Sequence, residues 1–147
     1  MDTRGGIWLI VGAGFSSGIA LMHVVIIFIG APAYLYFGAA DLARLASRGS
    51  LFPALLTLLI TAVFMAFGSY ALSGAGLIRR LPFLVPGLFL IGGVYTLRGL
   101  IVVQDLIRMV RGAGYPFRQT AFSAVSLIVG LVHFIGIFRR RAALKKA

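Results

Sequence analysis

Four long apolar stretches constrain the fold of this chain more than any other feature of its sequence. They cover residues 7–29, 52–72, 83–103 and 120–138. A helix needs about 20 apolar residues to cross the ~30 Å hydrocarbon core of a bilayer, and each stretch is close to that length. The sequence therefore predicts an integral membrane protein whose 147 residues form a single membrane domain.

The spans are expected to be helices, because a helix satisfies every backbone N–H and C=O group within its own segment. A membrane β-barrel would show shorter segments in which apolar and polar residues alternate. These stretches are apolar without alternation. The predicted fold class is therefore all-α, an integral membrane bundle of four antiparallel transmembrane helices.

Composition excludes a soluble domain. Hydrophobic residues make up 61% of the chain and charged residues 12%, whereas soluble domains average roughly 45–50% apolar and 25% charged residues. A net charge of +11 would indicate nucleic-acid binding in a soluble protein. Here the basic residues lie mainly between and beyond the apolar stretches, so we expect no nucleic-acid partner. The absence of cysteine excludes disulfides and cysteine nucleophiles.

A short helix at the outer membrane interface is predicted over residues 39–48, after the first span. Its Asp and Arg side chains share one face, and Leu42 and Leu45 share the other. Tyr34 and the aromatic residues that follow it precede this helix and are expected to anchor the chain at the interface.

The loop charges predict the orientation. With four spans, both termini and the second connection share one side, which carries eight basic residues against five on the other. The positive-inside rule places that side, with the basic tail 139–147, in the cytoplasm of a bacterial inner-membrane protein. The first apolar stretch exceeds the 7–15 residues of a signal-peptide core, so we expect an uncleaved first helix. The tail is expected to contact anionic lipid headgroups.

Two pairs of small residues predict close helix packing. Gly14 and Gly18 form a G-x-x-x-G pattern in the first span, and Ser126 and Gly130 form a similar pair in the fourth. We expect these faces to pack against each other or to mediate a homodimer or larger membrane complex. Gly12 extends the first pair toward a dinucleotide-binding fingerprint, but the strand and the acidic residue that this motif needs are missing.

Arg98 is the strongest candidate for a functional residue. A charge inside a span usually faces the bundle interior or a water-filled cavity, although its side chain could instead extend to the outer headgroups. At 1.5 Å per residue Arg98 lies ~22 Å from the cytoplasmic face, and each of the other helices has a polar residue near that depth. The predicted ligand-binding residues are Arg98, His23, Thr57, Tyr95 and Ser123.

Such a pocket would be cationic and open toward the periplasm. Its donors suit a carboxylate, a phosphate headgroup or a quinone carbonyl. A polar network without a ligand has the same composition and stays open as an alternative.

The two histidines of the chain, His23 and His133, raise the question of haem. Their depths of ~24 Å and ~8 Å from the cytoplasmic ends are too different for one haem iron between straight helices. We therefore predict no cofactor and no metal, and keep haem or quinone as an alternative.

Catalysis is not expected. The three acids, Asp2, Asp41 and Asp105, lie at chain ends or in loops by this division of the sequence, so no carboxylate is embedded in the membrane. Neither a catalytic triad nor a carboxylate pair can be assembled, and proton-coupled transport through a buried acid is disfavoured.

Four segments together resemble small four-span inner-membrane proteins of proteobacteria that have no assigned activity. They cover residues 30–38, 70–82, 95–99 and 130–136. The resemblance implies a bacterial inner-membrane location and brings no catalytic or ligand residues with it.

The sequence thus predicts a non-enzymatic inner-membrane protein that binds a small anionic or lipid-like ligand, or serves as an accessory subunit. A quinone- or haem-binding redox protein is the first alternative. A small transporter or channel formed by an oligomer is the second.

Overall fold

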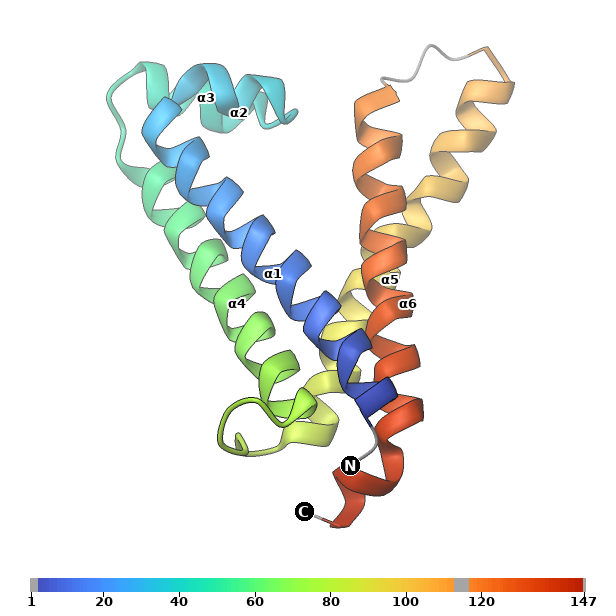
Figure 1. The fold of residues 1–147 in the computed structure, drawn as a ribbon. Coiled ribbons are helices and arrows are strands. Elements are labelled where there is room, and N and C mark those ends of the chain that lie inside the picture. The colour runs from blue at the N-terminus through green and yellow to red at the C-terminus, as the bar shows by residue number, and fades with distance from the viewer. Residues whose placement is uncertain (1–2, 113–116, 147) are drawn as a thin grey trace. The chain divides into compact units, whose positions relative to one another are not determined.

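The structure is a computed structural model that describes residues 3–112 and 117–146, and within these ranges all secondary structure is helical. Four helices are long and apolar enough to cross a membrane, which confirms the predicted fold class. The helices are α1 (Thr3–Ile29), α2 (Ala31–Tyr36), α3 (Ala40–Ser47), α4 (Phe52–Ala75), α5 (Leu84–Val110) and α6 (Phe117–Lys146), shown in Figure 1.

The last two long helices extend beyond the apolar stretches of the sequence. α5 has 27 residues and continues past residue 103 to Val110, and α6 has 30 residues. At 1.5 Å per residue they are about 40 and 45 Å long, more than the ~30 Å hydrocarbon core requires. Much of the predicted basic tail is therefore helical, while its final residue, Ala147, lies outside the described residues.

The chain divides into two compact units, which are described separately. The α2–α3 unit comprises residues 14–68, and the α5–α6 unit comprises residues 1–13 and 69–147. α1 and α4 each contribute residues to both units.

In the α2–α3 unit, α3 occupies the place of the predicted short helix over residues 39–48, and α2 is an additional short helix before it. Gly30, with φ of 75°, ends α1, and Pro32 lies in the first turn of α2, a position that proline favours. Tyr34 is 4% exposed, and its hydroxyl forms a 2.9 Å hydrogen bond with the hydroxyl of Thr57 on α4. Tyr34 therefore ties α2 to α4, and its predicted role as an interface anchor is wrong.

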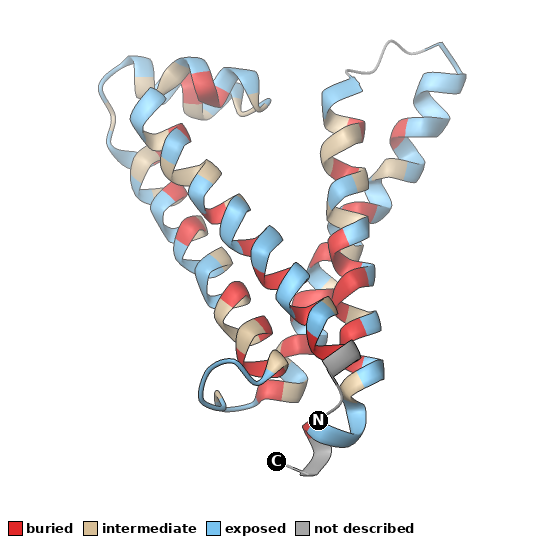
Figure 2. Cartoon of the chain, in the orientation of Figure 1, coloured by how far each residue is buried: buried red, intermediate tan, exposed pale blue. Residues whose placement is uncertain are grey.

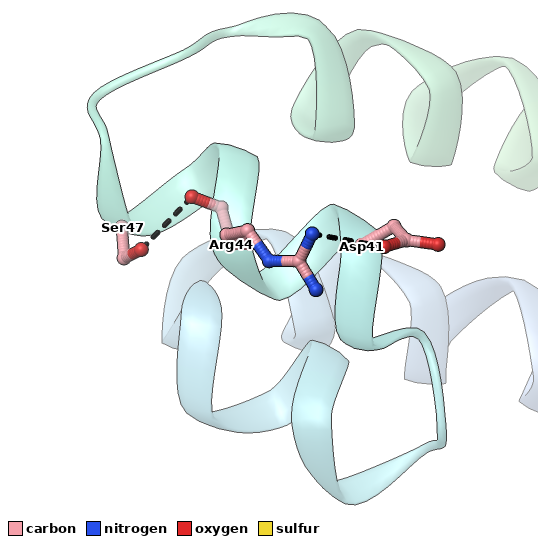
Figure 3. Close-up of polar contacts among 3 residues, drawn as sticks. All are labelled: Asp41, Arg44 and Ser47. Carbon is pink, nitrogen blue, oxygen red and sulfur yellow. Dashed lines mark hydrogen bonds and ion pairs between the residues drawn. The ribbon is translucent and has the colours of Figure 1, made fainter.

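The polar face of α3 is exposed, as its pattern predicts. Arg44 forms a 3.5 Å ion pair with Asp41, and the hydroxyl of Ser47 donates to the Arg44 carbonyl at 2.9 Å (Figure 3). Exposed ion pairs of this kind contribute at most about 1 kcal/mol. The opposite face carries Ala43, which is buried against the other short helix and α1.

In the α5–α6 unit, α5 and α6 lie side by side (Figure 1), and buried positions recur along both helices (Figure 2). Glycine brings their backbones together at two points. A Cβ atom on Gly99 would collide with the backbone of Leu127, and one on Gly130 would collide with Thr96. Nearer the chain termini, Leu9 of α1 joins the apolar core of this unit.

Candidate functional site

Arg98 reaches from α5 to α6. Its Nη1 donates a 3.0 Å hydrogen bond to the Ser123 hydroxyl, although the residue as a whole is exposed. Ser123 itself is 1% exposed. The guanidinium is thus directed at the neighbouring helix, and two of the five predicted site residues lie in direct contact.

Asp105 belongs to the same network. It is 2% exposed within the candidate span Leu84–Val110, and the Ser123 hydroxyl donates to its Oδ2 at 3.4 Å. Asp105 therefore lies in a helix and not in a loop, because α5 continues past the apolar stretch 83–103.

The three side chains form a relay of donor and acceptor. A serine hydroxyl has one donor and two acceptor positions, so Ser123 can accept from Arg98 while it donates to Asp105. A carboxylate removed from water requires such partners, because its desolvation is strongly unfavourable. The network therefore places a cation and an anion in contact with one hydroxyl, where α5 packs against α6.

Arg98 retains hydrogen-bonding capacity beyond this relay. A guanidinium has five N–H donors, and the contact with Ser123 engages Nη1. The exposed part of the side chain can meet an acceptor from outside the helix pair, such as a carboxylate, a phosphate or a carbonyl.

Tyr95 lies one turn from Arg98 but packs elsewhere. It is 3% exposed and stacks on the imidazole of His133, with ring centroids 5.5 Å apart. His133 is fully buried, and its Nδ1 lies 2.8 Å from the carbonyl of Val129. Tyr95 and His133 thus form an aromatic layer between α5 and α6.

The edge of the His133 ring that carries Cε1 and Nε2 lies against α1. A Cβ atom built on Gly12 would lie 2.6 Å from Cε1 and 3.0 Å from Nε2 of His133. Nε2 is buried and has no hydrogen-bond partner in the described part of the chain. An iron bound at this nitrogen would have to occupy the space of the α1 backbone, so His133 fits a haem ligand poorly.

His23 and Thr57 lie in the α2–α3 unit and have partners there. Nδ1 of His23 lies 2.8 Å from the carbonyl of Ile19, and its ring packs against Phe64 of α4. The Thr57 hydroxyl donates to the Pro53 carbonyl at 2.7 Å, in addition to its contact with α2. The two residues are engaged in local structure within this unit.

The predicted packing residues have different surroundings. Gly14 and Gly18 are exposed, and a Cβ atom on either would meet no atom within 4 Å. Ser126 donates to the carbonyl of Phe122 on its own helix, whereas Gly130 is buried against α5. Among these residues, Gly130 lies at a close helix–helix contact, and the Gly14–Gly18 face leaves room for a partner.

The spacing between Arg98 and Asp105 could have indicated, from the sequence alone, that Asp105 belongs to this site. Asp105 follows Arg98 by seven residues, which is two turns, so both lie on the same face of α5. Gly12 gave no such signal, because its role depends on where α6 places His133. Among the described residues no group of three or more His, Cys, Asp or Glu side chains could hold a metal ion.

No protein-family model, no curated protein and no solved structure matches the chain.

Proposed function

We propose that this chain is a non-enzymatic protein of the bacterial inner membrane that binds a small anionic or lipid-like ligand through Arg98. The hydrogen bond from Arg98 to Ser123 is the observation that carries the proposal. It holds the guanidinium at a defined place on α5 and α6, while the remaining donors are available to an acceptor group.

The network of Arg98, Ser123 and Asp105 supports binding because it holds the Arg98 guanidinium in place before a ligand binds. A guanidinium already held by one hydrogen bond loses less rotational freedom when a ligand binds. Asp105 moderates the positive charge, which favours a ligand with a single carboxylate, phosphate diester or polar carbonyl over a multiply charged anion. The same network suits an accessory subunit whose Arg98 contacts the acidic group of a partner.

The buried carboxylate of Asp105 supports a second candidate function, the transport of a proton or a cation. A buried carboxylate in a spanning helix is the kind of group that proton relays in membrane transporters use. An oligomer of this chain would then move a proton or a cation past Asp105, and replacement of Asp105 by Asn would abolish flux in reconstituted vesicles.

Mass spectrometry of molecules that co-purify with the protein tests the binding proposal. The wild-type protein and its variants are extracted in mild detergent, and bound small molecules are quantified per protein chain. The test compares Arg98→Ala and Arg98→Lys with Arg111→Ala, which removes an equal charge at the exposed end of the same helix.

We expect Arg98→Ala to reduce occupancy at least tenfold, because the anchoring guanidinium is gone. Arg98→Lys should retain part of it, since the charge remains but the forked geometry is lost. Arg111→Ala should match the wild type. Equal occupancy in Arg98→Ala and the wild type would refute the proposal, and recovery of a quinone or haem would instead support the redox alternative.

A further inference from the structure

Two arginines of the α5–α6 unit cap helix C-termini, Arg140 from α6 and Arg80 from the connection between α4 and α5. Nη1 of Arg140, on α6, donates to the carbonyl of Gly74 in the last turn of α4 at 2.8 Å. Nη2 of Arg80 donates to the carbonyl of Leu144 in the last turn of α6 at 3.1 Å. Both carbonyls belong to helix C-termini, where the last four carbonyls have no partner within the helix.

Two glycines leave space for the Arg140 side chain, which points inward between helix ends. A Cβ atom on Gly5 of α1 would lie 2.5 Å from Cγ of Arg140. Gly76, with φ of +77°, faces the guanidinium, and a Cβ atom there would lie 3.4 Å from both terminal nitrogens. The Arg140 side chain is therefore half-buried between helix ends, unlike the exposed Arg141 beside it.

A cavity of about 180 Å³ is lined by both of these arginines. Since a water molecule occupies ~30 Å³ of liquid, this volume holds a phosphate group with some water. Its walls include Ser73, Gly74, Gly76, Arg80, Arg140 and Leu144.

None of the described residues that line the cavity is acidic. Nε of Arg140 is buried and has no hydrogen-bond partner among the described residues. Each guanidinium has five N–H donors, and the cap on each side uses one of them. Two cations with spare donors around one cavity match a bound anion with several acceptor oxygens.

The position of the cavity indicates the class of anion. It lies where the candidate span of α4 ends at Ala75, that of α5 begins at Leu84 and that of α6 ends at Leu144. The ends of spanning helices lie at the level of the lipid headgroups, where phosphate groups are concentrated.

We propose that the Arg80–Arg140 cavity binds a phosphate group, supplied by the headgroup of an anionic phospholipid. This site is separate from Arg98 and does not depend on the function proposed for that residue. Since 14 residues separate Leu84 from Arg98, about 21 Å along α5 lies between the two sites.

Thermal unfolding of delipidated protein in detergent tests the proposal. Phosphatidylglycerol is titrated in, and phosphatidylcholine and inorganic phosphate are titrated in parallel. A ligand that binds the folded state raises the unfolding temperature with its concentration. The variants are Arg80→Gln and Arg140→Gln, and Arg141→Gln is the control that removes an equal charge from an exposed neighbour.

We expect phosphatidylglycerol to stabilise the wild type and Arg141→Gln, and to act at least tenfold more weakly on Arg80→Gln and Arg140→Gln. If Arg140→Gln does not fold because the α4 cap is lost, Arg80→Gln carries the test. An equal effect of inorganic phosphate would support the site with free phosphate as its source. Equal stabilisation of Arg80→Gln and the wild type by phosphatidylglycerol would overturn the proposal. So would the absence of any effect of phosphatidylglycerol and inorganic phosphate on the wild type.

Discussion

Arg98 and Asp105 lie two turns apart on α5, and the hydroxyl of Ser123 on α6 contacts both side chains. In a hydrocarbon environment each charge alone would be strongly unfavourable. A hydroxyl between them lowers that penalty, because it accepts from the cation and donates to the anion. The relay therefore explains how Arg98 and Asp105 are accommodated where α5 packs against α6.

Replacement of Ser123 by Ala should destabilise the protein more than the same change at a nearby serine. Asp105 would lose its hydroxyl donor, and the expected loss is about 1–3 kcal/mol, the usual effect of an unsatisfied buried polar group. Ser126→Ala is the control, because that hydroxyl bonds to the carbonyl of Phe122 on its own helix. Its effect should stay within about 0.5 kcal/mol. Reversible unfolding in mixed micelles measures both, and equal effects would contradict the relay.

Replacement of Gly12 by Ala should also be destabilising, because its Cβ atom would overlap the buried imidazole of His133. Overpacking of this kind costs about 1–3 kcal/mol. Gly14→Ala serves as the control: its Cβ atom meets nothing within 4 Å, so better helix propensity should leave it neutral or slightly stabilising. Unfolding temperatures in detergent distinguish the two variants. A Gly12→Ala protein as stable as Gly14→Ala would show that His133 does not pack against α1.

At the scale of single residues, the sequence was informative where one side chain is energetically unfavourable within a membrane span. Arg98 could be singled out because a charge within a span demands an explanation. Asp105 was expected at the end of a span or in a loop because the apolar stretch ends at residue 103, and the continued α5 brings its carboxylate against Ser123. His133 and Gly12 depend on the packing of α1 against α6, which no local pattern encodes.

At the scale of helices, α5 and α6 are held together at two glycine contacts. Membrane helices gain little from burying apolar surface against each other, since lipid is equally apolar, and close backbone approach supplies packing instead. Gly99 allows contact with the backbone of Leu127, and Gly130 allows contact with Thr96.

Alanine at either glycine should weaken the pair by about 1–3 kcal/mol, because the added methyl group would have to displace backbone. Gly93 lies on the same helix as Gly99, and a Cβ atom there meets nothing within 4 Å. Gly93→Ala should therefore leave stability unchanged or raise it by up to ~1 kcal/mol. Denaturation in mixed micelles compares the three variants. If Gly93→Ala is as damaging as Gly99→Ala, the close approach of these helices is not the cause.

Hydropathy predicted the four long helices because length and apolarity follow directly from the thickness of the bilayer. It could not predict α2, because six residues that contain a proline carry too little pattern to separate a helix from a loop. The apolar stretch ends at residue 103, before α5 does, since a helix that leaves the hydrocarbon core no longer needs apolar residues.

At the scale of the whole molecule, the charge distribution predicts that both termini face the cytoplasm. The chain has no cysteine, so single cysteines introduced at exposed positions give labelling without background. Ala40 of α3 and Ala142 of α6 are both exposed. In intact spheroplasts a membrane-impermeant maleimide should label Ala40→Cys, and it should label Ala142→Cys only after the membrane is permeabilised. The reverse pattern would invert the proposed orientation.

The central claim is that Arg98 is directed at α6 instead of extending to the lipid headgroups, and a double-mutant cycle measures it most directly. The free energy of unfolding is determined in mixed micelles for the wild type, Arg98→Met, Ser123→Ala and the double variant. We expect an interaction energy of at least about 0.6 kcal/mol, typical of a hydrogen bond between membrane helices. Effects that add within about 0.3 kcal/mol would show that the two side chains do not interact, and the binding function proposed for Arg98 would lose its structural basis.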